Sequence, residues 1–423
     1  MEIKIAFIRS YSVFLFASIW LSYLKIMGTS LKLVDVIGSF HIVLFIILVS
    51  YRKKYLKNPI VIALTLLSLL SVVSSLVFVQ NIFIGARIIS SLVLPLYLTF
   101  VYPDILCRLR TSILVNIKFV LILSCLFGFF QTNTGFFWTN GQALFFGVTG
   151  RATGLFANSA HNGVFIFMLI YTYVTVSKKI NKVDYFYIIL GYLALFFSET
   201  RAVIGLAILA IPIYFLHQLN YFEFTASRFV PKRFFRMLIF FFILPFSTII
   251  YFNWNIIYFV YETLTSVFVF RLNAQPNFLI DYFSEYCFPM QGEEYLDQSL
   301  GHRLERIIFV FHTVIRGEYW YGHGLGRCIG GGADNQLVRI TNDLGLLGLL
   351  LNVLIYCAIA YVAIMKKNFK MIYLLVTMLF LGLFYDILYL QLSVVCLGII
   401  LAYLQDDRSA RLINSSIAEE VSN

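Results

Sequence analysis

The stretch GHRLERIIFVFHTVIRGEYWYGHGLGRCIGGGADNQLVRITNDLGLLG, residues 301–348, decides how the rest of the chain is interpreted. It is the longest polar interruption in a sequence otherwise built of apolar runs, and its last residues lead into one of those runs. Arginines, histidines, a glycine-rich turn and an Asp-Asn pair gather in it. Such a concentration of polar residues beside a membrane-spanning segment indicates a functional site at one side of a membrane.

The composition around this stretch is typical of a polytopic membrane protein. Of the 423 residues, 60% are hydrophobic and 13% are charged, whereas soluble domains carry about 25% charged residues. The mean hydropathy is +0.86. The first apolar run, from about Ile5 to Leu24, lacks a small-residue cleavage site after it, so we expect a retained transmembrane helix there.

The apolar runs predict an all-α protein with about twelve transmembrane helices, because a span needs about 20 mainly apolar residues. Their centres fall near residues 16, 41, 70, 92, 121, 168, 192, 209, 246, 354, 378 and 396. Clusters of Lys and Arg follow the even-numbered spans, which predicts that both termini are cytoplasmic. These loop clusters also account for the net charge of +11, so we expect no nucleic acid as a partner.

This topology divides the chain into membrane and loop regions. The regions are helices 1–9 over residues 1–254, a large periplasmic loop over 255–341, helices 10–12 over 342–404 and a cytoplasmic tail over 405–423. A second long outer segment runs from Gln131 to about His161. Both outer segments are rich in aromatic residues, which disfavours disorder. In the large loop we predict amphipathic surface helices from Tyr261 to Leu272 and from Arg303 to Ile315.

Neither the cysteines nor any sequence motif indicates a metal site. Cys287 and Cys328 fall in the large loop, where a disulfide is feasible. The outer loops contain no DxD motif, and the chain contains no Walker loop and no HExxH motif. We therefore expect a site without a metal or a cofactor.

The basic residues expected outside are, beyond Lys32, all arginines: Arg87, Arg151, Arg201, Arg271, Arg303, Arg306, Arg316, Arg327 and Arg339. A guanidinium group matches phosphate oxygens bidentately and is desolvated more easily than an ammonium group. This pattern favours an anionic substrate such as a pyrophosphate, held beside lipid. For Arg271, Arg316 and Arg327 the simpler interpretation is a solvated or paired surface charge.

Three of these arginines, Arg201, Arg303 and Arg306, are the main candidates for binding the anionic substrate. Arg201 lies in the tight turn SETRA between two spans, where an ionisable residue is costly and usually functional, although Glu199 is an alternative partner for it. Arg303 and Arg306 share one face of a predicted helix, where they form either an anion site or ion pairs with Glu305 and other nearby acids.

The remaining candidates border the sixth and tenth spans. Arg151 and His161 bracket the segment before the sixth span, and His161 is either a hydrogen-bonding anchor or part of the site. Asp334, followed by Asn335, is either a general base or a helix cap. The glycines around His323 form either an anion-binding nest or a plain turn.

These stretches together resemble the superfamily of bacterial O-antigen polymerases and O-antigen ligases. The resemblance covers the middle and C-terminal two thirds of the chain. Its motifs are GRATGLFANSAHNG at 150–163, SETRA at 198–202, HRLER at 302–306, YGHGLG at 321–326, ADNQLVRI at 333–340 and DLGLLGLL at 343–350.

The resemblance implies an inverting glycosyltransferase of the bacterial inner membrane whose active site faces the periplasm. Its donor and acceptor would be oligosaccharide repeats linked to undecaprenyl pyrophosphate, and a chain-length determinant protein would be a partner. Arg201 matches the hairpin arginine of the family and Arg303 the large-loop arginine, and both would bind pyrophosphate without a metal.

The other site residues follow less directly from the resemblance. Arg306, Arg151, Arg339, Asn335 and His161 would assist in binding the pyrophosphate or the glycan. Ligases of the family carry a His-Asn pair before the late span, and this chain has Asp334-Asn335 instead. The difference favours a polymerase, and the general base stays open between Asp334, His323 and no dedicated base.

Two alternatives remain from the sequence. A ligase that transfers the glycan to lipid A-core would use the same chemistry with another acceptor. A lipid-linked oligosaccharide flippase, which is no enzyme, would be expected to carry charges along a path through its spans, whereas Arg87 and Lys118 are nearly the only bases deep in the predicted spans.

Overall fold

The structure is a computed structural model of the chain. It describes residues 59–78, 103–139, 142–145, 152–154, 159–177, 180–200, 203–208, 320, 322, 336–365, 369–385 and 391–405. The predicted spans centred near residues 16, 41, 92 and 246 lie outside the described residues. So do the two predicted surface helices, Cys287 and Cys328.

The described elements are mainly helices, and they coincide with predicted spans. They are α3 (Pro59–Phe78), α5 (Pro103–Thr134), α6 (Ser159–Val176), α7 (Lys182–Phe197), α14 (Gln336–Met365), α15 (Phe369–Phe384) and α16 (Gln391–Gln405). Residues 203–208, in the span predicted near residue 209, are helical as well. Both α3 and α5 begin at a proline, which is tolerated in a first turn because its missing N–H would have no intrahelical partner there.

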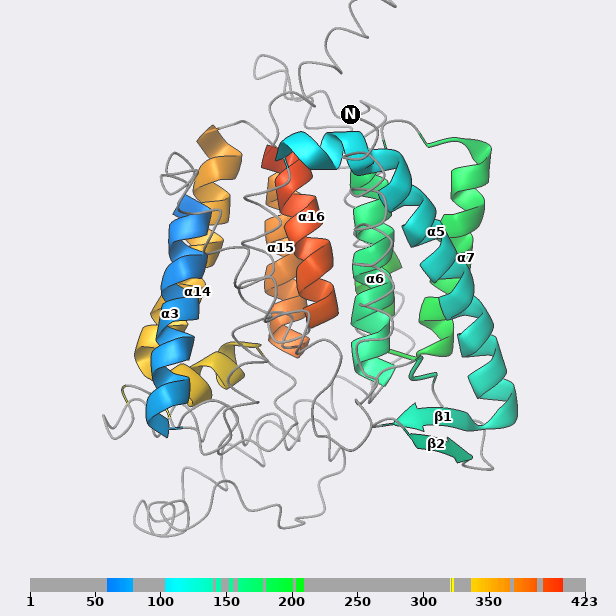
Figure 1. Ribbon diagram of the computed structural model, residues 1–423, viewed down its shortest axis with the longest axis horizontal. Helices are drawn as coiled ribbons and strands as arrows, with labels where there is room; N and C mark the ends of the chain where they lie inside the picture. Colours follow the sequence, from blue (N-terminus) through cyan, green and yellow to red (C-terminus); the bar gives the residue numbers. More distant parts are fainter. Residues whose placement is uncertain are drawn as a thin grey trace, which may run out of the picture.

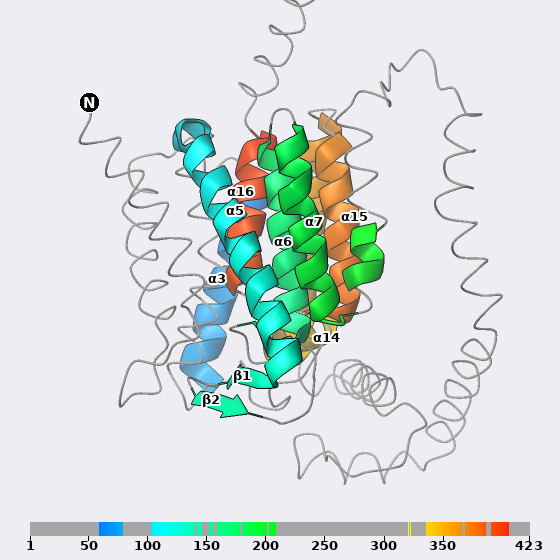
Figure 2. The ribbon, with the colours of Figure 1, turned by 90° about the vertical axis from the view of Figure 1, so that its right-hand side faces the viewer.

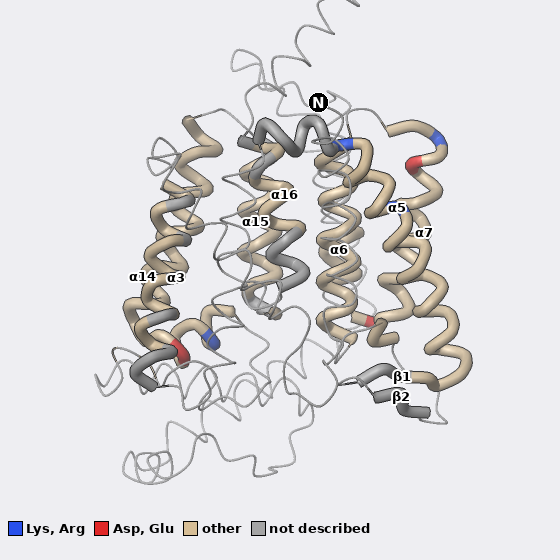
Figure 3. The backbone as a smooth tube through the Cα atoms, viewed as in Figure 1, with Lys and Arg blue, Asp and Glu red and all other residues tan. Residues whose placement is uncertain are grey.

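Among the described helices, three stretches are long and apolar enough to cross a membrane: Arg110–Thr134, Ser159–Val176 and Gln336–Met365. The prediction of a mainly helical protein with helices able to cross a membrane is confirmed for the described part of the chain. The total of twelve spans, the cytoplasmic termini and the bacterial inner membrane stay predictions. Figure 3 shows long uncharged stretches along the described helices, with most of their charged positions lying toward the helix ends.

The helices stand side by side, and α6 lies in their middle (Figures 1 and 2). Helix α3 packs against α14, α14 against α15, and α16 against α5 and α6, while α5, α6 and α7 pack against one another. Nearly every residue of α6 is buried, including Phe165, Phe167, Tyr171 and Tyr173. A helix that is apolar on all sides belongs in a core, so α6 forms the centre of the described part.

A short antiparallel hairpin follows α5 and departs from the all-α prediction. Strand β1 (Phe136–Thr139) pairs with β2 (Gln142–Phe145), with Phe136 opposite Phe145. Gly135 precedes β1 with a positive φ of 65°. The aromatic residues of β1 favour a strand locally, although the segment is too short to show an alternating pattern.

The hairpin marks one end of the bundle (Figure 1). At this end α5 and α7 finish and α6 and α14 begin, and we call it the hairpin end. The sequence predicts the outer side of the membrane for these same helix termini.

Helix α14 begins earlier than the sequence predicts and is sharply kinked. It starts at Gln336, inside the stretch assigned to the large loop, and it breaks at Gly345, whose φ is 65° and ψ is −160°. The Nε2 atom of Gln336 donates to Asn352 Oδ1 and to Tyr356 OH, both at 3.0 Å, so the arm 336–344 folds back against the longer arm. Hydropathy misses this arm because its polar residues are buried through mutual hydrogen bonds.

Candidate functional site

A buried carboxamide in the last turn of α5 holds the segment that precedes α6. The Nε2 atom of Gln131 donates to the carbonyl oxygen of Gly154 at 2.8 Å, and its Oε1 atom accepts from the Gly154 N–H at 2.8 Å. The side chain of Gln131 is fully buried. Both polar ends of this amide are therefore used to hold one backbone residue.

A second carboxamide holds the same segment from α6. The Nδ2 atom of Asn162 donates to the Ala152 carbonyl oxygen at 3.1 Å. Gly154 has a φ of 61°, and a Cβ there would lie 2.6 Å from Asn162 Oδ1, so only glycine fits. The Ala152 N–H donates to the carbonyl oxygen of Phe197 at 2.8 Å. Residues 152–154 are thus bound to α5, α6 and the end of α7.

The turn after α7 closes onto the start of α6. Thr200 Oγ1 donates to the Ser159 carbonyl oxygen at 3.1 Å, and Ser198 Oγ donates to Thr200 Oγ1 at 3.1 Å. Glu199, between them, has a φ of 49°, an uncommon conformation that is concentrated at functional sites. A Cβ on Gly163 would lie 2.6 Å from Thr200 Oγ1, which shows how closely the two helix ends approach.

These contacts form one connected set at the hairpin end. We call it the polar junction, and its members are Gln131, Ala152, Gly154, Ser159, Asn162, Phe197, Ser198 and Thr200. It joins the motif GRATG to the motif SETRA, which lie far apart in the sequence. The proximity of Ala152 and Thr200 follows from α6 and α7 being antiparallel neighbours.

The predicted site residues are placed unevenly relative to the polar junction. His161 lies in the first turn of α6, half-buried, beside Asn162 of the junction. Arg151 and Arg201 lie outside the described residues, but each is the direct sequence neighbour of a junction residue, Ala152 and Thr200 respectively. Because Ala152 bonds to Phe197, three residues before Thr200, the described neighbours of both arginines belong to one junction.

A second polar group lies in the short arm of α14, also at the hairpin end. Arg339 is half-buried and its Nε atom lies 3.8 Å from Asp343 Oδ2, one helical turn later. Asp343 is 1% exposed, and its Oδ1 atom accepts from Asn342 Nδ2 at 3.0 Å. Ser74 Oγ of α3 donates to the Asp343 carbonyl oxygen at 3.4 Å. Arg339 thus faces a buried carboxylate that the sequence analysis did not single out, although the i, i+4 spacing was a signal for it.

Trp320 and Gly322, at the start of the glycine-rich stretch, contact α14 at its kink. The Leu346 N–H donates to the Trp320 carbonyl oxygen at 3.0 Å. A Cβ on Gly322 would lie 2.5 Å from the nitrogen of Gly345, and one on Gly345 would lie 2.1 Å from the Trp320 oxygen. Glycines at 322 and 345 are therefore required for this backbone contact. His323 follows Gly322 directly and lies outside the described residues, as do Arg303, Arg306, Asp334 and Asn335.

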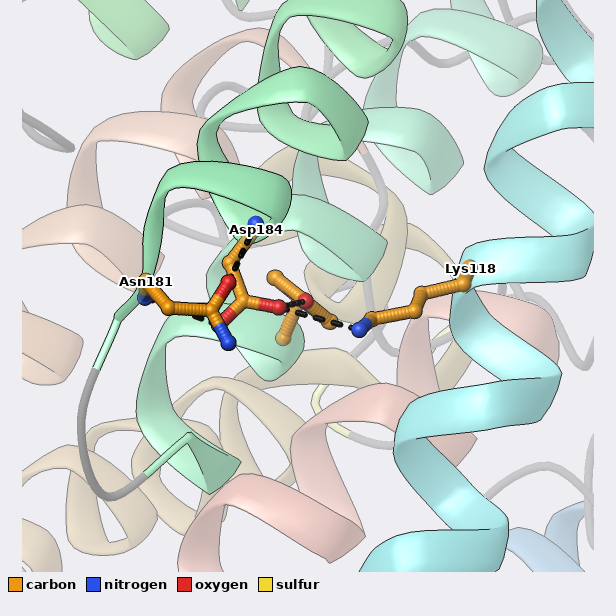
Figure 4. A network of polar contacts seen from close by, with 4 residues as sticks. Lys118, Asn181 and Asp184 are labelled. Atoms are coloured by element: carbon orange, nitrogen blue, oxygen red, sulfur yellow. Dashed lines mark hydrogen bonds and ion pairs between the residues drawn. The ribbon is translucent and has the colours of Figure 1, made fainter.

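Toward the other end of the helices, Lys118 is held by an ion pair. Figure 4 shows Lys118 reaching from α5 toward Asp184 of α7, and the Nζ to Oδ1 distance is 2.9 Å. The Tyr173 hydroxyl donates to the same carboxylate oxygen, and the Asn181 N–H donates to the other at 3.0 Å. Lys118 Nζ also lies 4.8 Å from the ring centroid of Tyr187. This base, deep in a predicted span, therefore serves to join α5, α6 and α7.

Comparison of the chain with protein-family models and with characterised proteins gives no match.

Proposed function

We propose that the chain is an inverting glycosyltransferase that polymerises oligosaccharide repeats linked to undecaprenyl pyrophosphate, as in the synthesis of O-antigen or a related surface polysaccharide. The reaction would take place at the periplasmic face of a bacterial inner membrane. The observation that carries the proposal is the polar junction, because it contains Ala152 and Thr200, the sequence neighbours of Arg151 and Arg201, at one end of the bundle.

The chemistry of a pyrophosphate explains why such an arrangement would be useful. Two guanidinium groups that issue from one junction can each bind a different phosphate of the same group through paired hydrogen bonds. Donors already fixed in place need no reorganisation as charge develops on the departing pyrophosphate. We propose that Arg303 and Arg306 of the large loop complete this binding site, and that Arg339, which lies beside Asp343 on the short arm of α14, assists them.

The surface beside the junction suits a lipid-linked substrate. Leu126, Phe129 and Phe196 are exposed on the last turns of α5 and α7. Apolar side chains of this size, exposed on α5, which is long and apolar enough to cross a membrane, and on its neighbour α7, would contact lipid or the polyprenyl chain of the substrate. The charged pyrophosphate would then lie at the polar end of the same helices.

The proposed step is a single displacement. A hydroxyl oxygen of the acceptor repeat attacks the anomeric carbon of the donor glycan, and the bond from that carbon to the pyrophosphate oxygen breaks. The hydroxyl proton passes to Asp334 or His323, or directly to solvent if there is no dedicated base. Undecaprenyl pyrophosphate leaves with its negative charge stabilised by the arginines, and the configuration at the anomeric carbon is inverted.

The experiment that tests the proposal replaces the arginines one at a time. Arg201→Ala and Arg303→Ala, each verified as folded and inserted, should lower the rate of polymer formation by about 10²-fold or more, since each removes one charge-assisted contact to the leaving group. Arg228→Ala, in a basic cluster predicted to be cytoplasmic, serves as the matched control and should retain the wild-type rate. Full activity in both Arg201→Ala and Arg303→Ala would refute the proposal.

A further inference from the structure

Residues 152–154 are hydrogen-bonded to three different helices, α5, α6 and α7. Four bonds reach this short stretch: two from Gln131, one from Asn162 and one to the carbonyl oxygen of Phe197. Both residues are buried: Gln131 is 0% exposed and Asn162 is 3% exposed. Ala152 and Thr153 are buried, so the two carboxamides take the place that water has at an exposed loop.

We infer that Gln131 and Asn162 are positioning residues, which fix residues 152–154, directly after Arg151, relative to the turn 198–200, directly before Arg201. This inference rests on the proposed function, and it adds to it two residues that need not touch the substrate. Ala152 and Thr200, the described sequence neighbours of the two arginines, both belong to the polar junction.

The two carboxamides are themselves held rigidly. Gln131 lies in the last turn of α5, and that helix approaches α7 so closely that a Cβ on Gly128 would lie 2.9 Å from the Phe197 ring. Asn162 lies in the first turn of α6, next to Gly163, which contacts Thr200. Side chains anchored on packed helices hold a binding residue more accurately than a loop alone would. Phe197 and Thr200 belong to the same junction, so residues 152–154 and the turn after α7 are held by the same helices.

Loss of this positioning should affect the transition state more than the ground state. A misplacement of about 1 Å in a binding group can lower the rate by about 10²-fold, although no contact to the substrate is removed. The variants should therefore lower kcat and leave KM within a few-fold, because a lipid-linked substrate remains concentrated in the membrane.

The variants that test this inference are nearly isosteric. Gln131→Glu replaces the donor that faces the Gly154 carbonyl oxygen with an acceptor, and Asn162→Asp does the same at Ala152. Asn133→Ala is the matched control, because Asn133 lies on the same turn of α5 but is exposed and bonds only within its helix, to the Phe129 carbonyl oxygen. The second isosteric variant keeps the test valid if the first fails to fold.

Two measurements are made on each variant in lipid nanodiscs. The first is the rate of polymer formation, resolved into kcat and KM. The second uses a background that carries Arg151→Cys and Arg201→Cys, in which a short bis-maleimide joins the two positions and mass spectrometry of the linked peptides gives the yield. We expect Gln131→Glu and Asn162→Asp to lower kcat by about 10-fold to 10²-fold and to reduce the cross-link yield, while Asn133→Ala changes neither.

The outcomes separate this inference from the proposed function. Wild-type kcat and an unchanged cross-link yield in folded Gln131→Glu and Asn162→Asp would overturn the positioning role. The wild type could make no polymer while the cross-link yield still fell in Gln131→Glu. That outcome would support the positioning role and overturn the proposed function alone. A higher KM with no change in kcat would also overturn the inference.

Discussion

Replacing Gly345 with alanine should destabilise the protein, because the added methyl group would collide with Trp320 and Gly322, which cross α14 at this position. A Cβ at this position would lie 2.1 Å from the Trp320 oxygen and 2.5 Å from the Gly322 nitrogen, far inside contact distance. The backbone conformation, with φ 65° and ψ −160°, is itself one that costs other residues about 1–3 kcal/mol. Separation of the two backbones would also remove the Leu346 to Trp320 hydrogen bond, worth about 1 kcal/mol. The expected loss in the free energy of unfolding is therefore about 2–4 kcal/mol.

The assay is unfolding of purified Gly345→Ala in detergent micelles or nanodiscs, monitored by helical circular dichroism. Gly205→Ala is the matched control, because Gly205 lies in helical residues 203–208 and a Cβ there would meet nothing within 4 Å. That control should be as stable as the wild type or more stable by up to about 1 kcal/mol, since alanine favours a helix over glycine. Wild-type stability of Gly345→Ala would refute the crossing, because no tight backbone contact could then exist at the kink.

Two further predictions concern buried charge and the general base. Lys118→Met leaves the buried Asp184 carboxylate without its cation and should lower the free energy of unfolding by about 3 kcal/mol. A double variant, Lys118→Met with Asp184→Asn, should recover most of this loss. Equal stability of the wild type and both variants in the same unfolding assay would contradict this role. Of Asp334→Asn and His323→Ala, the change that removes the general base should lower the rate of polymer formation by about 10²-fold or more, and full activity in both would mean that the proposed reaction uses no dedicated base.

The positions of the described helices were predictable because lipid imposes a simple requirement on the sequence. A helix that crosses the hydrocarbon layer must be apolar for about 20 residues, so hydropathy alone locates α5, α6 and the long arm of α14. The start of α14 was not predictable in this way. Gln336, Asn342 and Asp343 read as loop residues on any hydropathy scale, yet they are buried because their polar atoms engage other polar groups.

The candidate site was predictable only in part, for a related reason. The motifs GRATG and SETRA precede and follow two successive spans, so antiparallel packing of those spans was enough to predict that they meet. Gln131 carries no such signal, because a single glutamine at the end of a helix has no characteristic neighbours. Its importance comes from the paired contact with Gly154, which exists only once α5 is packed against α6 and α7.

The most direct test of the proposed function is to supply purified protein in lipid, with EDTA present, with a matching undecaprenyl-pyrophosphate repeat unit and no other acceptor. The products are separated on a gel. A ladder of products that differ by one repeat unit is the predicted result, and it would establish polymerisation without a metal. A single transfer that occurs only after addition of lipid A-core would show a ligase instead. Unchanged substrate under both conditions, with substrate of verified native structure, would contradict glycosyl transfer by this protein.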